Sequence, residues 1–129
     1  METQLRAALI EWLRADPALA PINSVAEEAP LEASLPWVGI AASASADWSA
    51  KDRKGREIRI ALELHCRGED PASAASLAAA IEARIEAMPR AQPGFEIAST
   101  LFLRARAEKR PRGTRSILIQ YRFRVLESA

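Results

Sequence analysis

The side chains best suited to chemistry are one histidine and one cysteine, and they are neighbours, His65 and Cys66. The surrounding run alternates apolar and polar residues, which predicts a strand, and neighbouring residues on a strand point to opposite faces. The pair therefore cannot act as nucleophile and base. The chain has no second histidine or cysteine to complete a zinc site or a disulfide. The five glycines stand singly, so the sequence has no Gly-rich phosphate-binding loop.

Carboxylates are the remaining candidates for acid–base chemistry. Glu27, Glu28 and Glu32 form an acidic patch among alanines and prolines. General acid–base catalysis needs a pocket that shifts the pKa of the carboxyl group. Alanine and proline neighbours favour a solvated loop instead. We therefore expect no catalytic residue, no metal and no cofactor, and hence no enzyme.

The chain is organised around a predicted β-hairpin. Residues 57–67 alternate apolar and polar side chains with Ala61 as the one neutral exception, and residues 36–46 can form the returning strand. The tip between them is charged and carries Trp48, and Trp and Arg are enriched at the energetic centres of protein interfaces. We expect this tip to be an assembly surface, with the candidate interface residues Trp48, Lys51, Asp52, Arg53, Lys54 and Arg56.

The remaining pattern predicts two helices and a second hairpin in one domain, 1–129. The predicted elements are a helix at 3–14, strands at about 36–46 and 57–67, a helix at 71–88, and strands at about 96–107 and 115–126. Residues 22–26 can add a short edge strand, and Asp70 suits the N-cap of the second helix. The expected fold is α+β: a single antiparallel sheet of four to five strands with two helices packed on one face.

The apolar faces of these elements predict one core. Its expected members are Leu9, Leu13, Ile58, Ile60, Leu62, Leu64, Leu77, Ile81, Ile85, Ile119, Tyr121 and Phe123. In the strand at 96–107, unbroken alternation places Leu101 and Leu103 with Ile97 on one face and Phe102 opposite. Phe102 would then share the wet face with arginines and two leucines, and such a patch indicates a protein interface.

Charge is distributed unevenly along a chain of net charge +1. Residues 1–50 hold two basic and seven acidic residues, and residues 104–124 hold eight basic and one acidic residue. Such asymmetry can serve head-to-tail contact between copies of one protein or the binding of a nucleic acid, or it can simply reflect solvated strand faces. The basic candidate interface residues are Arg104, Arg106, Arg110, Arg112 and Arg115.

Composition narrows the class of protein further. With 49% hydrophobic and 27% charged residues, the chain is typical of a soluble globular domain. No apolar run is long enough to span a bilayer, and the start of the chain lacks the pattern of a signal peptide.

Specific reading of single-stranded nucleic acid would need exposed aromatic platforms, but Tyr121 and Phe123 fall on the apolar face. This argues against specific reading of a nucleic acid as the main function. A small nucleic-acid-binding α+β module that uses the basic C-terminal hairpin is kept as the alternative function.

The order of several segments resembles the phage tail-completion proteins, also called tail terminators or tail-to-head joining proteins. The opening helix that ends at Asp16-Pro17 and the strand entry Leu35-Pro36-Trp37-Val38 resemble that family. The most recognisable segment is Asp47-Trp48-Ser49-Ala50-Lys51-Asp52 with Gly55-Arg56-Glu57. The Ala-rich helix from Pro71, then Phe102, then Arg115 to Arg124 resemble its closing half. Family members often have a basic and hydrophobic strand near residues 22–25, where this chain continues with alanine and glutamates.

The resemblance implies a structural virion protein of a tailed phage, prophage or gene transfer agent. Such a protein would be made in a bacterial cytoplasm and would reside at the head–tail junction. It would form a homohexameric ring that caps the tail tube protein and meets the head–tail connector protein. DNA would pass through the lumen without specific binding, and no membrane would be involved.

Overall fold

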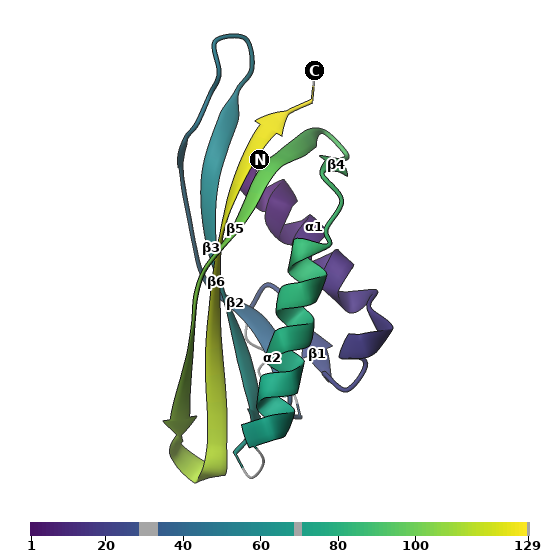
Figure 1. Cartoon of the computed structure of the whole chain (residues 1–129), viewed down its shortest axis with the longest axis vertical. Helices are drawn as coiled ribbons and strands as arrows, with labels where there is room; N and C mark the ends of the chain where they lie inside the picture. The colour runs from purple at the N-terminus through teal and green to yellow at the C-terminus, as the bar shows by residue number, and fades with distance from the viewer. Residues whose placement is uncertain (29–33, 69–70, 129) are drawn as a thin grey trace.

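The computed structural model describes residues 1–28, 34–68 and 71–128, which form one twisted sheet and two α-helices (Figure 1). The helices are α1 (Glu2–Arg14) and α2 (Pro71–Glu86), with short 3-10 turns η1 (Pro17–Leu19) and η2 (Pro111–Gly113). The strands are β1 (Ser24–Val25), β2 (Trp37–Asp47), β3 (Gly55–Arg67), β4 (Ala91–Gln92), β5 (Phe95–Arg110) and β6 (Thr114–Glu127).

The first helix forms because its apolar residues recur every three or four positions. Leu5, Leu9 and Leu13 are fully buried along that stripe. The helix ends before Asp16, whose carboxylate accepts a hydrogen bond from the amide of Ala18 and so caps the 3-10 turn η1. The chain then returns towards the sheet edge at β1.

The six strands lie in the order β1-β2-β3-β6-β5-β4 and curl into a half-barrel. The prediction of a purely antiparallel sheet of four to five strands is wrong. Strand β1 pairs parallel to β2, which makes the sheet mixed, and β4 adds a sixth strand beside the start of β5. Strand β1 falls within the short edge strand expected at 22–26, but its parallel pairing was not predicted, and β4 was not predicted at all. Both strands are two residues long, too short for any alternation of apolar and polar residues to be seen. The four long strands are antiparallel to their neighbours.

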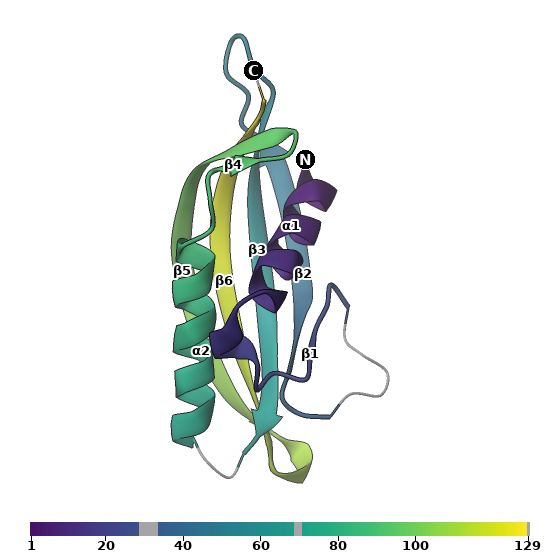
Figure 2. The same ribbon diagram turned by 90° about the vertical axis from the view of Figure 1, so that its right-hand side faces the viewer.

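Both α-helices lie on the same side of the sheet, here called the helix face (Figure 2). The opposite side is called the outer face. The predicted core is confirmed: eleven of its twelve members are buried, and Leu77 packs against them half-buried. Strand β3 lies between β2 and β6, and its residues Ile58, Ile60, Leu62, Leu64 and Cys66 all enter the core.

The face assignment predicted for β5 is wrong from Ser99 to Phe102, between two bulges in its pairing with β6, and it holds again from Arg104 onward. The register shifts between Ile97 and Ser99, and again between Phe102 and Arg104. Each extra residue turns the following side chains to the other face. Phe102 therefore faces the helices and meets the Tyr121 ring edge-on, 5.5 Å between centroids. Leu101, opposite Arg122, faces outward instead.

Helix α2 packs its alanine-rich side over β3 and β6. Ala74, Ala78, Ile81 and Ile85 are buried, and the small alanines allow a close approach to the sheet. The Tyr121 hydroxyl donates a hydrogen bond to the Glu86 carboxylate at 2.7 Å. Burial raises the pKa of the Tyr121 phenol far above its ordinary value, and the Glu86 and Glu82 carboxylates raise it further. The expected N-cap Asp70 lies outside the described residues.

A candidate assembly surface

The β2–β3 hairpin tip is held in shape by hydrogen bonds within the chain. The Ser49 hydroxyl donates to Asp47 at 2.7 Å and accepts from the amide of Gly55 at 3.1 Å. The Arg53 guanidinium donates from Nε to the Glu127 carbonyl at 3.1 Å, which ties the tip to the end of β6. The tip is thus a formed projection with charged side chains on its surface.

Trp48 lies half-buried at the base of this tip. Its ring packs against Arg124 of β6, with 5.3 Å between the guanidinium carbon and the ring centroid. Its amide donates to the Gly55 carbonyl at 3.0 Å. The indole therefore contacts its own sheet, and part of its surface stays open. The exposed members of the predicted interface here are Lys51, Asp52, Lys54 and Arg56.

The basic β5–β6 hairpin forms the second charged cluster. Arg110 is 3.3 Å from the Glu63 carboxylate and 3.6 Å from that of Glu108, and Arg106 is 2.7 Å from Glu108. Arg112 is exposed in the turn, with a left-handed backbone φ of 63°. Within the described ranges no ion pair involves Arg112, so its charge faces solvent.

Two other arginines of this hairpin have partners within the chain. Arg104 donates a hydrogen bond to the Gln120 side chain, and Arg115 donates to the Gly68 carbonyl at 3.1 Å. Arg115 is half-buried, so it is the least available of the predicted basic interface residues.

The two charged clusters lie at opposite ends of the molecule's long axis (Figure 1). The β2–β3 tip projects at the upper end of the view and the β5–β6 turn at the lower end. The structure therefore does not join the predicted interface residues into one patch. It separates them into two end surfaces connected by the long strands.

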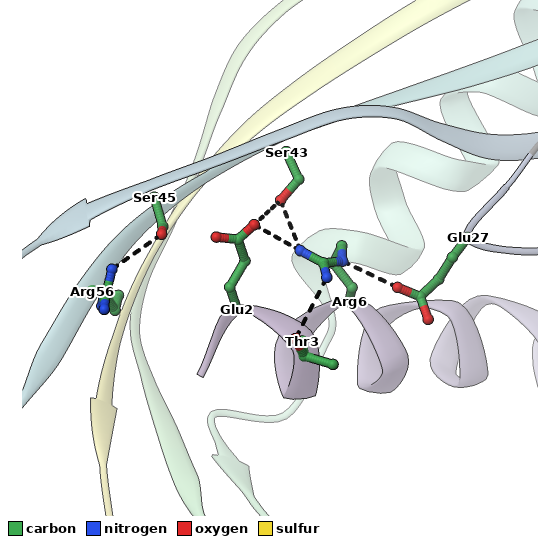
Figure 3. A network of polar contacts seen from close by, with 7 residues as sticks. All are labelled: Glu2, Thr3, Arg6, Glu27, Ser43, Ser45 and Arg56. Carbon is green, nitrogen blue, oxygen red and sulfur yellow. Dashed lines mark hydrogen bonds and ion pairs between the residues drawn. The ribbon is translucent and has the colours of Figure 1, made fainter.

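A polar network joins α1 to the β1–β2 side of the sheet (Figure 3). Arg6 contacts the carboxylates of Glu2 at 2.7 Å and Glu27 at 3.1 Å, and the Ser43 hydroxyl donates to Glu2 at 2.8 Å. Hydrogen bonds from Ser45 and Ser43 lower the pKa of the Glu2 carboxyl, with Arg6 adding to the effect. Part of the acidic charge of the first fifty residues is thus neutralised internally, whereas Glu28 is exposed.

The residues considered first for chemistry take structural positions. His65 stacks on Trp37 with 4.1 Å between ring centroids and lies 2.8 Å from Glu63 on the outer face. Cys66 points the other way, into the core, and burial raises the pKa of its thiol. Glu32 lies outside the described residues. In the part of the chain that the structure describes, no three His, Cys, Asp or Glu side chains gather to hold a metal ion.

Sequence reasoning predicted that Phe102 is open to solvent but missed its neighbours Leu101 and Leu103. Leu101, Phe102 and Leu103 are 45%, 41% and 36% exposed, and among the residues that the structure describes they are the large hydrophobic side chains open to solvent. The available signal was the run of three consecutive large apolar residues. Three neighbours on a strand cannot all reach one core, so at least one must face away.

Neither described α-helix combines the length and apolarity needed to cross a bilayer. The comparison with curated proteins gives no match. Among solved structures, the chain is similar to one described as "Virion of native gene transfer agent (GTA) particle". The TM-score is 0.78 at 25% sequence identity, and the match covers 98% of this chain and 96% of the other.

The half-barrel fold and this match are those of a structural protein of a virion-like particle. The family described as "Tail completion protein gp17" matches residues 7–126. The chain belongs to this tail completion family, and the resemblance inferred from its sequence is confirmed.

Proposed function

We propose that this protein forms a homo-oligomeric ring, hexameric as the family resemblance implies, at the head–tail junction of a phage-like particle. The ring caps the tail tube and contacts the head connector, and DNA passes through its lumen without specific binding. The observation that carries the proposal is the separation of the two charged clusters at opposite ends of the long axis. A ring whose axis follows the strands would present one cluster on each face.

Family membership and the likeness to a chain of a gene transfer agent virion support this proposal. Such a particle brings a tail component into contact with other structural proteins. The function would then reside in surfaces, since joining two assemblies requires complementary contacts and no bond chemistry.

The test is complementation of a particle-producing strain that lacks this gene. Trp48→Ala, and separately Lys51→Glu with Lys54→Glu, should leave the fold nearly intact by circular dichroism. Both should increase the fraction of unjoined heads and tails counted by electron microscopy, because they remove an interface anchor or reverse the charge of the tip.

The matched control is Ser76→Glu with Ala79→Glu, which adds negative charge at exposed positions of α2. It should join heads and tails normally. Normal joining by both tip variants would exclude the tip as the joining surface and leave the β5–β6 hairpin as the candidate. The nucleic-acid-binding alternative would be favoured by two results together: the purified protein binds DNA in a salt-sensitive manner, and it stays monomeric in the presence of tail tubes.

A further inference from the structure

The sheet has two free edges. Strand β1 pairs with β2 only at Trp37 and Val38, and β4 pairs with β5 only at Phe95 and Glu96. Among the described residues, no strand pairs with the open side of β2 at 42–47 or of β5 at 98–110. Free edges present unpaired amide and carbonyl groups, which can pair with a strand of another chain.

The two free edges occupy the same position along the strand direction of the sheet. One row across the four long strands consists of Ala42, Ala61, Gln120 and Arg104. A second row, five residues further along β2, consists of Asp47, Arg56, Val125 and Ile97. The open stretch of β2 and the stretch 98–104 of β5 are therefore bounded by the same two rows. A copy placed beside this one, without a shift along the strands, brings one stretch against the other.

The strand directions also match. Strands β2, β3, β6 and β5 alternate in direction, so β2 and β5 run opposite to each other. A neighbouring copy in the same orientation then places its β2 antiparallel to β5, which continues the alternation across the junction. Such a contact is head-to-tail, and repeating it generates a ring when the rotation closes.

Side-chain sizes on the two edges are complementary. The β5 stretch carries the exposed Leu101, Phe102 and Leu103, whereas the β2 stretch consists of alanines and serines up to Asp47. On the outer face, a groove of about 520 Å³ extends from Ala42 and Ala44 across the sheet to Leu103. Small residues on one edge leave room for large apolar residues from the other.

Charges are complementary just beside these stretches. The Glu27 carbonyl accepts a hydrogen bond from the amide of Ile40, which places Glu27 and the exposed Glu28 beside the lower part of β2. The row of Ile40 reaches β5 at Ala105, between Arg104 and Arg106. In the side-by-side arrangement, the exposed Glu28 of one copy would lie near these two arginines of the next, whereas the Glu27 carboxylate is paired with Arg6 of its own copy.

We propose that copies of this chain associate by antiparallel pairing of β5, over Ala98–Arg104, with β2, over Ala42–Asp47, of a second copy. Leu101, Phe102 and Leu103 are the apolar contacts of this junction, and Glu28 and Arg106 add charge complementarity. The inference rests on the homo-oligomer of the proposed function and identifies the surface that builds it.

Cysteine cross-linking tests the pairing directly. Ala44 and Leu101 lie in one row on the outer face, on opposite edges of the sheet. Three strand spacings separate them by about 14 Å within one copy, too far for an internal disulfide. In a background of Cys66→Ala, protein with Ala44→Cys is mixed with protein with Leu101→Cys and oxidised, alone and on purified tail tubes. Ala42→Cys and Ala46→Cys are also used, because shifts of two residues keep side chains on the same face.

We expect disulfide-linked dimers in at least one of these mixtures and none when Ser76→Cys, on exposed α2, replaces the β2 cysteine. Leu101→Lys with Leu103→Lys should weaken self-association by more than about tenfold in sedimentation, because it puts charge at an apolar contact. Ser76→Lys with Ala79→Lys is the matched control and should associate normally. An oligomer that forms without any of these cross-links overturns edge pairing and leaves the ring proposal standing. A protein that stays monomeric, alone and on tail tubes, overturns both.

Discussion

Replacement of Gly55 by alanine tests the close packing at the base of the hairpin tip. A Cβ atom at this position would lie 2.5 Å from the Trp48 carbonyl oxygen, 2.8 Å from Leu126 Cδ2 and 2.9 Å from the Val125 carbonyl oxygen. The leucine side chain can rotate away. The two carbonyl oxygens belong to the backbone on either side of β3, so they can move only with their chain segments.

The cost follows from what must be displaced. Overpacking in a tightly packed site costs about 1–3 kcal/mol. Displacing the Trp48 carbonyl also disturbs the hydrogen bond from the Trp48 amide to Gly55, worth about 1 kcal/mol. A gain of about 0.5 kcal/mol from the stiffer unfolded chain offsets part of this. The expected loss in the free energy of unfolding is about 1.5–3.5 kcal/mol.

Urea unfolding of dilute protein measures this loss as a lower midpoint with an unchanged slope. Gly94→Ala is the comparison, because its Cβ would meet only the Gln4 side chain at 3.6 Å, although φ is +85°. That variant should lose only the cost of a left-handed backbone, about 1–2 kcal/mol. If Gly55→Ala unfolds at the wild-type urea concentration, the hairpin base has room for a methyl group and the packing argument is wrong.

Two other predictions concern the core. Leu62→Ala and Ile81→Ala should each lower the free energy of unfolding by about 2–5 kcal/mol, because both side chains are almost fully buried; unchanged melting temperatures in both would contradict the core assignment. Tyr121→Phe should remove the fall in the free energy of unfolding that the wild-type protein shows at high pH. The raised pKa of Tyr121 means that only the unfolded state ionises above about pH 10, so wild-type stability falls there by up to about 1.4 kcal/mol per pH unit. The free energy of unfolding is measured by urea unfolding at several pH values between 9 and 11. An equal decrease with pH for the wild-type protein and Tyr121→Phe would refute this prediction.

Local sequence pattern was sufficient for the central strand and the helices. The alternation from Ile58 to Cys66 and the spacing of Leu5, Leu9 and Leu13 in α1 each identify a buried face without knowledge of the partner. The reason is that the period of an element is a property of its own backbone, so one buried face leaves its mark on the sequence. The family could be recognised from the sequence for a similar reason: short segments that occur in a fixed order along the chain are enough to identify it.

Tertiary structure alone decided which elements pair and which way the side chains of β5 point. The parallel β1 and the short β4 are held by neighbours from other parts of the chain, and two residues carry no period. The bulges after Ile97 and Phe102 arise where β5 is fitted to β6 and the core. The first exchanges the faces of Leu101 and Phe102, and the second restores the predicted faces from Arg104 onward. The separation of the two charged hairpins depends on the antiparallel order of β2, β3, β6 and β5, which places their turns at opposite ends of the sheet. Local periodicity records only that a residue is buried or open; pairing between distant segments decides what it meets.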